Sequence, residues 1–349
     1  MKRILTIFIT ILILAGALSA CAKGTDNNQN DTQNPNDAKK ISIVTTIFPI
    51  YDWVREILGD QADNVELTLL LDSEVDLHSY QPNVDDIVKI SNCDMFIYVG
   101  GESDEWVDDI LKQATNKEMV VVDLLEVLGD SVKTEEIVAG MEAENEHEDD
   151  SNHEEHEENE DHEALKEREE QEHDEHIWLS LKNAEIICQE IANQLSLIDA
   201  ANQEIYSTNT AAYIKKLATL DAEYQKVVAE APQHTLLFGD RFPFRYLVDD
   251  YSLDYFAAFA GCSAETEASF ETIAFLAAKV DELGLSSILT IDGTKHTIAE
   301  TIISNTTTKD QQILAMDSLQ AATREDVAKG KTYLSSMTQN LEVLKEALQ

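Results

Sequence analysis

Short apolar runs alternate with amphipathic helical patterns twice along this chain, and this alternation limits its fold more than any other feature. Strand-like apolar runs occupy residues 41–45, 65–71, 95–99 and 119–122, and then 235–238, 253–259, 287–291 and 313–316. Helical patterns separate or follow them at 50–58, 84–90, 106–113, 181–195, 245–250, 269–283, 298–304 and 326–348. Continuous apolar strands separated by helices are typical of a parallel sheet covered on both faces. We therefore predict an α/β fold with two lobes, each with a parallel sheet flanked by helices.

The first lobe is predicted over residues 41–198 and the second over 231–349. Between them, residues 199–230 show apolar side chains at helical spacing, and no Gly or Pro occurs before Pro232. A helix of about 28 residues is about 42 Å long, which is more than one lobe needs. We therefore predict that this segment is a stiff linking helix between the lobes.

The N-terminus carries the pattern of an export signal over residues 1–20. Lys2 and Arg3 precede an apolar run at 4–17, and the run ends in Leu-Ser-Ala followed by Cys21. These last residues resemble the bacterial lipobox, in which the cysteine is acylated and becomes the mature N-terminus. An uncleaved anchor helix is the alternative, but the run is shorter than the about 20 residues of a membrane span. Residues 21–40 are polar and of low complexity, and we predict a disordered tether there.

The formal net charge of -43 makes nucleic acid an unsuitable partner, because phosphates would be repelled, and favours a cation. Much of this charge lies in an acidic loop at 141–175, which has too few apolar residues to offset its ordering entropy. We predict that this loop is mobile in solvent.

Six of the nine histidines lie in the stretch from Met141 to Leu179, which is otherwise dominated by Glu and Asp. Neutral imidazoles among carboxylates attract divalent metals, especially zinc, whereas a plain solvated linker is the alternative. Pairs of histidines three residues apart do not match the four-residue spacing of the HExxH protease helix. Five of these histidines are predicted as accessory metal contacts: His147, His153, His156, His162 and His173.

Three cysteines remain once Cys21 is assigned to the lipid anchor, namely Cys93, Cys188 and Cys262. They show no CxxC spacing, so neither a disulfide framework nor a cysteine zinc site is predicted. We interpret them as small buried apolar residues, with a Cys188 to Cys262 disulfide as the alternative.

In open α/β sheets, ligands bind beyond the carboxyl ends of the strands. Five residues with metal-binding side chains follow predicted strand ends: His78, His176, Asp240, Asp292 and Asp317. Two imidazoles with one or two carboxylates can hold a divalent ion at about 2.0 to 2.2 Å. For any one of these residues alone, a helix cap or a turn is the alternative.

Several segments also resemble one family. Residues 76–82, DLHSYQP, resemble the Asp-x-His-x-(Tyr/Phe)-x-Pro motif of the metal-binding solute receptors of ABC transporters, of the ZnuA and AdcA type. Residues 174–179, DEHIWL, resemble their Asp-Pro-His-x-Trp-Leu motif, and residues 261–269 their Glu-Pro-Ser helix start. The end of the chain, 333–348, resembles their closing helix, so that the resemblance spans about 41–349.

This resemblance implies that His78 and His176 are the first and second metal ligands, and the His-rich acidic insert is typical of the zinc branch. Asp240 stands where the zinc branch commonly has His, and its oxygen favours the manganese branch. Asp292 and Asp317 compete for the fourth position, with water as a further alternative. The family implies one ion in the cleft between two lobes, a small closure, delivery to a membrane permease and no covalent chemistry.

We therefore predict a monomeric, extracellular Zn²⁺ receptor of an ABC importer, lipid-anchored on the outer face of the bacterial cytoplasmic membrane, and not an enzyme. Alternatives are a Mn²⁺ receptor of the same fold, and a surface zinc store or adhesin. No GxGxxG occurs, and Gly330-Lys331-Thr332 lacks the Walker glycine five residues earlier, where Glu325 stands. A metallohydrolase stays open as an alternative, and it would need an open coordination position and a nearby base.

Overall fold

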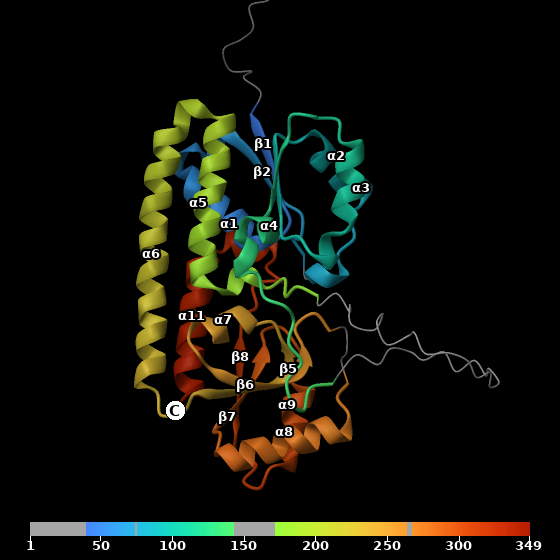
Figure 1. Cartoon of the computed structure of the whole chain (residues 1–349), viewed down its shortest axis with the longest axis vertical. Helices are drawn as coiled ribbons and strands as arrows, with labels where there is room; N and C mark the ends of the chain where they lie inside the picture. Colours follow the sequence, from blue (N-terminus) through green and yellow to red (C-terminus); the bar gives the residue numbers. More distant parts are fainter. Residues whose placement is uncertain (1–39, 74, 143–171, 264–266) are drawn as a thin grey trace, which may run out of the picture. The chain divides into compact units, whose positions relative to one another are not determined.

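Two four-stranded parallel sheets form the frame of the protein (Figure 1). The first contains β1 (Ile41–Thr45), β2 (Val65–Leu69), β3 (Met95–Tyr98) and β4 (Val120–Asp123), in the order β2-β1-β3-β4. The second contains β5 (Thr235–Phe242), β6 (Asp254–Ala260), β7 (Ser287–Ile291) and β8 (Gln312–Met316), in the order β6-β5-β7-β8. Each sheet therefore repeats one order, second, first, third and fourth, and the predicted two-lobed α/β fold is confirmed.

The computed structural model describes residues 40–73, 75–142, 172–263 and 267–349. We call 40–198 the N-terminal lobe and 231–349 the C-terminal lobe. The predicted signal peptide, tether and lipidation site at Cys21 lie outside the described residues, as do His147, His153, His156 and His162. In the ranges that are described, no helix is both long and apolar enough to cross a membrane.

The central strands are covered on both faces, as their continuous apolar sequences indicate. In β3 the side chains of Met95, Phe96 and Ile97 are all fully buried, and every residue of β7 is buried. Strands buried in this way cannot slip in register without exposing apolar surface. The strand ends, from which the connecting loops leave, are therefore fixed in position.

Helices of the N-terminal lobe form two groups. On one side α1 (Phe48–Leu58) and α5 (Leu181–Ile198) pack together, and on the other side lie α2 (Val84–Asn92) and α3 (Trp106–Gln113) (Figure 1). Their starts are fixed locally: Pro49 lies in the first turn of α1, and Asn83 forms a capping box with Asp86 at α2. A short helix that was not predicted, α4 (Leu124–Leu128), begins where the Asp123 side chain accepts a hydrogen bond from the Glu126 N–H.

The C-terminal lobe contains α7 (Arg245–Asp250), α8 (Phe270–Leu283), α9 (Thr297–Asn305), α10 (Arg324–Ala328) and α11 (Tyr333–Ala347). Helices α8 and α9 pack on each other, whereas α11 packs against β7 and β8. The prediction of one closing helix over 326–348 is wrong, because the helix is interrupted at Gly330, whose φ of +95° is not helical. Thr323 and Thr332 each form a capping box that starts a separate helix.

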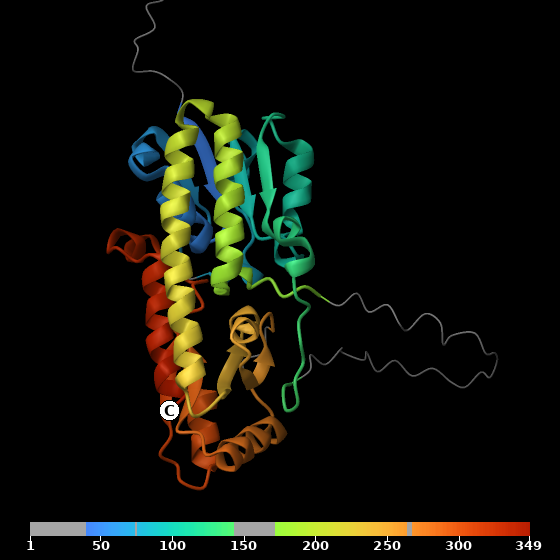
Figure 2. The ribbon, with the colours of Figure 1, turned by 60° about the vertical axis from the view of Figure 1, so that its left-hand side comes forward.

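The predicted linking helix is α6 (Gln203–Glu230), which has 28 residues and is therefore about 42 Å long. Figure 2 shows it running alongside both lobes. At the N-terminal lobe Asn209 Nδ2 donates to the carbonyl of Ile57 at 3.0 Å, and at the C-terminal lobe Tyr224 OH donates to the carbonyl of Met337 at 2.6 Å. The helix is thus attached to both lobes by hydrogen bonds.

One apolar cluster continues through both lobes, and a smaller one lies under α8 and α9. The large cluster includes Trp53 and Tyr333, whose ring centroids are 5.1 Å apart in an edge-on arrangement. Burying one such side chain contributes about 1.5 to 3 kcal/mol. The three cysteines in the described part of the chain are free, so the Cys188 to Cys262 disulfide considered above is wrong.

Candidate metal centre

His78 lies in the connection that follows β2, on a single 3₁₀ turn at Leu77–Ser79. Asp76 caps this turn, because its Oδ1 accepts the His78 N–H at 3.1 Å. Leu77 is fully buried and anchors the turn in the core. The direction of the His78 ring is therefore set by its backbone.

His176 follows the first sheet's fourth strand in the chain and directly precedes the 3₁₀ turn Ile177–Leu179, whose three side chains are fully buried. Trp178 Nε1 donates to the carbonyl of Ser318 at 2.8 Å, which ties this turn to the C-terminal lobe. Asp174 Oδ1 accepts from the His176 N–H at 2.9 Å and from its Nδ1 at 3.0 Å. The His176 side chain is itself fully buried.

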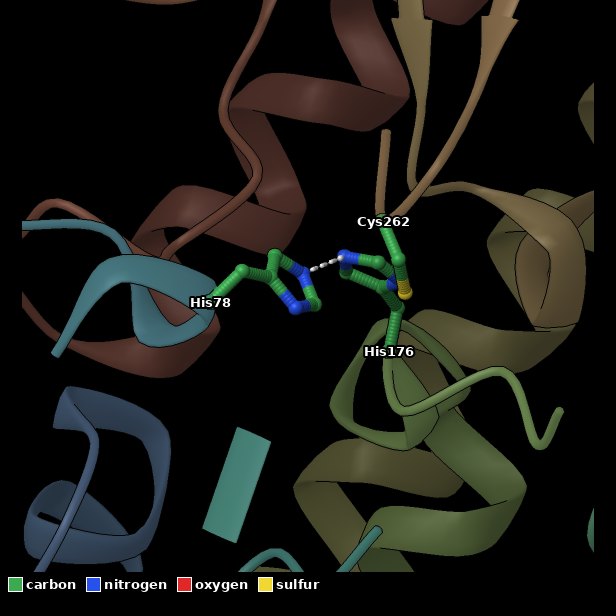
Figure 3. A group of neighbouring side chains, drawn as sticks. All are labelled: His78, His176 and Cys262. Carbon is green, nitrogen blue, oxygen red and sulfur yellow. Dashed lines mark hydrogen bonds between the residues drawn. The ribbon is translucent and has the colours of Figure 1, made fainter. Parts of the chain in front are cut away.

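The two imidazoles face each other through their Nε2 atoms, which are 3.3 Å apart (Figure 3). On the far side of the His78 ring, Nδ1 lies 2.7 Å from Ser103 Oγ and 3.5 Å from Glu175 Oε2. A partner on Nδ1 holds an imidazole in the tautomer whose Nε2 carries the lone pair, as in carboxylate, histidine and zinc triads. Both rings therefore present metal-binding nitrogens to the same point.

His78 is neutral at physiological pH. Its burial, the neighbouring His176 and the Arg241 charge lower its pKa to about 4, against an opposing effect of the Asp76 carboxylate. Because a metal ligand must be deprotonated, the neutral imidazole is ready to bind a cation without releasing a proton.

Two residues of the C-terminal lobe complete the group around the histidines, and neither was predicted as a metal ligand from the sequence. Cys262 is two residues past β6, and donor atoms of His78, His176 and Cys262 all lie within 4.8 Å of one another (Figure 3). Gln320 follows β8, and its Nε2 lies 3.1 Å from His176 Nε2 and 3.4 Å from His78 Nε2. The strand-end rule that selected His78 also selects Cys262, but the missing CxxC spacing led to its interpretation as an apolar residue.

Gly261 explains how Cys262 comes so close. A Cβ atom at Gly261 would lie 3.0 Å from His176 Cε1 and 2.9 Å from the carbonyl oxygen of Phe242. Only glycine permits this approach of the backbone to the ring. Burial and the carboxylates of Glu135 and Asp174 raise the pKa of the Cys262 thiol.

The three predicted carboxylates lie elsewhere and are not members of this cluster of described residues. Asp240 Oδ2 accepts from the Ile291 N–H at 3.2 Å and from the Thr294 hydroxyl at 2.7 Å. Asp317 accepts from the Leu319 N–H and pairs with Lys331 at 2.8 Å. Asp292 is exposed at the edge of a neighbouring cavity. Backbone N–H groups, a hydroxyl and a lysine thus pair with two of the three carboxylates predicted as metal ligands, Asp240 and Asp317.

Arg241 brings a positive charge to this region. Its Nη2 donates to Asp76 Oδ2 at 2.8 Å, so that the C-terminal lobe pairs with the turn that carries His78. Burial raises the pKa of the Asp76 carboxyl, but the charge and hydrogen bond of Arg241 outweigh it, and the net pKa lies below its usual range. The pair therefore links the two lobes beside the histidines.

An acidic cavity of about 610 Å³ opens beside His78 and Cys262. Its lining includes five glutamates, Glu102, Glu135, Glu142, Glu172 and Glu175, together with the exposed His173. Burial raises the pKa of Glu175, partly offset by hydrogen bonds from Ser103. Glu142 and Glu172, which directly precede and follow the acidic segment 143–171 in the sequence, both line this cavity.

A family model described as ZnuA, zinc-uptake complex component A, periplasmic, matches residues 43–347. The zinc-binding lipoprotein AdcA of Streptococcus pneumoniae (strain R6) is 30% identical over 309 residues, which cover 88% of this chain and 56% of AdcA. The high-affinity zinc uptake system protein ZnuA of Bacillus subtilis is 28% identical over 337 residues, which cover 97% of this chain and 94% of that protein. The chain thus spans about half the length of its AdcA relatives.

Solved structures show the same fold. The Zn(II)-bound ZnuA-like domain of Streptococcus pneumoniae AdcA is 25% identical, with a TM-score of 0.65 and coverage of 88% of this chain and 99% of that domain. The metal-dependent lipoprotein YcdH of Bacillus subtilis is also 25% identical, with a TM-score of 0.68 and the same coverage. With a family match over most of its length and two lobes that meet at paired histidines, this chain belongs to the ZnuA family of zinc-uptake complex component A.

Proposed function

We propose that this protein is the receptor of a zinc importer, which binds one Zn²⁺ through His78 and His176 and delivers it to an ABC permease. The observation that carries the proposal is the 3.3 Å separation of the two Nε2 atoms. Two imidazole nitrogens at 2.0 to 2.1 Å from one tetrahedral zinc are about 3.3 Å apart. The side chains therefore already have the spacing that the ion requires.

The buried position of these nitrogens also favours a cation. His176 is fully buried and the His78 side chain is 13% exposed, so little water reaches the gap between them. Two lone pairs at this distance repel each other unless a proton or a cation lies between them. A bound Zn²⁺ removes this repulsion and uses both nitrogens.

Zinc fits this site better than manganese. The manganese alternative depended on the oxygen of Asp240, and that carboxylate is hydrogen-bonded to Ile291 and Thr294. Imidazole nitrogens favour zinc, whereas Mn²⁺ prefers carboxylate, carbonyl and water oxygens. Relatives whose names describe zinc binding and zinc uptake support the same cargo.

The acidic cavity offers a route for the cation to the histidines. Its glutamates concentrate cations by their summed field. We propose that the histidines of the acidic loop (141–175), including His173, contact zinc weakly and release it into this cavity. Attachment through an acylated Cys21 would hold a monomeric receptor at the outer face of the cytoplasmic membrane, near its permease. Binding and delivery, rather than catalysis, are the proposed activity.

A competition titration of the full chain with zinc and manganese tests the proposal. We expect one tight zinc site per chain, lost in His78→Ala and in His176→Ala. His234→Ala is the matched control, because His234 is exposed at the opposite end of β5. The same titration on a chain without residues 143–171 should retain the tight site. If the chain without residues 143–171 has no tight zinc site although both histidines are present, the protein is a surface zinc store and not a receptor.

A further inference from the structure

We propose that Cys262 binds the transported cation through its sulfur, so that the receptor holds Zn²⁺ with two imidazoles and one thiolate. This proposal rests on the function proposed above, since the cation is the same zinc that His78 and His176 bind. The ligands predicted from the sequence were imidazole nitrogens and carboxylate oxygens. The ligands proposed here include a sulfur atom instead of a carboxylate.

The first support is distance. Donor atoms of His78, His176 and Cys262 lie within 4.8 Å of one another before any cation is placed. A tetrahedral zinc with nitrogen at 2.0 to 2.1 Å and sulfur at 2.3 Å holds the two donors about 3.6 Å apart. Cys262 Sγ and one ring nitrogen of each imidazole are therefore within about 1.2 Å of the separations that a single tetrahedral zinc requires.

The second support is the order of the strands. His78 comes from the connection after the second strand of the first sheet, β2, and Cys262 comes from the connection after the second strand of the other sheet, β6. His176 and Gln320 likewise follow the fourth strands, β4 and β8. Because both sheets have the same strand order, Cys262 is the topological counterpart of His78. Each lobe thus brings two side chains to the same point from equivalent connections.

The third support is the difference between Cys262 and the other described cysteines. Cys93 is fully buried, and its Sγ donates to the carbonyl of Ile90 at 3.2 Å. Cys188 is also fully buried, in α5. Cys262 is partly exposed and lines the acidic cavity, and its backbone N–H donates to Glu135 Oε1 at 2.9 Å. Only its sulfur, among these three, faces both a route for cations and the paired imidazoles.

Binding forms one sulfur to zinc bond and releases the thiol proton to solvent, so that charge and atoms balance. A divalent cation deprotonates a coordinating thiol outright. Thiolate is a soft ligand that favours Zn²⁺, Cd²⁺ and Cu⁺ over Mn²⁺, Mg²⁺ and Ca²⁺. A sulfur ligand therefore gives the receptor a basis for rejecting the hard cations that its acidic cavity also attracts.

X-ray absorption at the zinc edge tests this directly. The sample is the full chain with Cys21→Ser, which removes the cysteine outside the described residues, loaded with one equivalent of zinc. We expect one sulfur at about 2.3 Å from zinc. Cys262→Ser should lose this sulfur and bind zinc at least about 100-fold more weakly, since even the loss of a supporting contact costs about 10- to 100-fold. Cys188→Ala, the matched control, should keep both the sulfur and the affinity.

Cobalt substitution gives a second readout that leaves Cys262 and both histidines unchanged. The Co²⁺-loaded Cys21→Ser chain should show a thiolate-to-cobalt charge-transfer band in the near ultraviolet. A zinc shell of nitrogen and oxygen alone, with tight binding still lost in His78→Ala, would overturn the role of Cys262 and leave the zinc receptor standing. Tight zinc binding that survives both His78→Ala and Cys262→Ser would overturn both proposals.

Discussion

The two lobes have the same strand order but offer different chemistry at their carboxyl ends. In the N-terminal lobe the connections after β2 and β4 carry imidazoles, His78 and His176. In the C-terminal lobe the equivalent connections carry a thiol and an amide, Cys262 and Gln320. The sheet order therefore decides where donors come together, and the connecting loops decide which donors they are.

Supporting contacts differ between the lobes in the same way. Carboxylates orient the imidazoles of the N-terminal lobe: Asp174 contacts His176 Nδ1 at 3.0 Å, and Glu175 lies 3.5 Å from His78 Nδ1. In the C-terminal lobe the carboxylates at strand ends hold backbone turns instead, as Asp240 does. The same residue type thus supports the candidate metal ligands in one lobe and the fold in the other.

Removing a donor from each lobe in turn should show the largest effect. We expect His176→Ala to weaken zinc binding by at least about 1,000-fold, because it removes a buried direct ligand. Gln320→Ala should weaken it by about 10-fold or less, because a neutral amide is a poor zinc ligand beside an imidazole. Competition with a chelator measures both. Equal losses for the two variants would mean that Gln320 is as strong a zinc ligand as His176, contrary to the difference expected between an amide and an imidazole.

Asp52 forms a contact between the lobes that does not involve the paired histidines, and its charge can be tested separately. This buried carboxyl on α1 accepts the Tyr333 N–H at the start of α11 at 2.8 Å. Burial raises its pKa from 3.8 to about 6, although the Tyr333 N–H opposes the shift. The native protein therefore holds this proton more tightly than the unfolded chain does. Its stabilising effect is full below about pH 4 and is lost as the pH rises through about 6.

We expect Asp52→Asn to raise the free energy of unfolding at pH 7 by up to about 3 kcal/mol relative to its effect at pH 4, since the amide still accepts from Tyr333 without carrying charge. Denaturant unfolding at both pH values measures this difference. Asp108→Asn, at an exposed position of α3, is the control. The same stability change at both pH values would show that folding does not raise the pKa of this carboxyl.

The strand and helix pattern predicted most of the fold because strands that are buried on both faces appear in the sequence as continuous apolar runs. The bounds of β1, β7, α3 and α7 agree with the predicted ranges. Features set by distant contacts were missed. Strand β5 continues to Phe242 because its pairing with β6 resumes after a register shift between Phe238 and Arg241, and Phe242 pairs with Ala260. No pattern in the neighbouring sequence predicts this pairing.

The candidate site shows the same limit. His78 and His176 could be selected because each lies in a motif whose turn is built from its own neighbours, Asp76 and Asp174. In the C-terminal lobe, a carboxylate can bind a metal only where backbone N–H groups do not already use it as a hydrogen-bond acceptor. That competition is decided by contacts such as the one between Asp240 and Ile291, 51 positions apart in the chain.

Asp174 tests whether the imidazoles of the N-terminal lobe depend on their carboxylates. We expect Asp174→Ala to weaken zinc binding by about 10- to 100-fold with one zinc still bound per chain, because His176 loses the acceptor that fixes its tautomer and ring orientation. Chelator competition and metal analysis measure affinity and stoichiometry. Asp292→Ala removes an exposed carboxylate from the other lobe and should leave the affinity unchanged. Unchanged binding in Asp174→Ala would mean that packing alone orients the ring.

Asp240 gives the smallest expected effect on zinc and the clearest contrast between the lobes. If its carboxylate supports the fold through Ile291 and Thr294, Asp240→Ala should lower the free energy of unfolding by about 1 to 2 kcal/mol, because a buried N–H and a hydroxyl lose their acceptor. Zinc affinity should stay within about threefold. Thr294→Val, which removes one of the two donors, should reproduce part of the stability loss with the same affinity. A large loss of zinc or manganese binding in Asp240→Ala, with unfolding unchanged, would instead make this carboxylate a ligand and restore the manganese alternative.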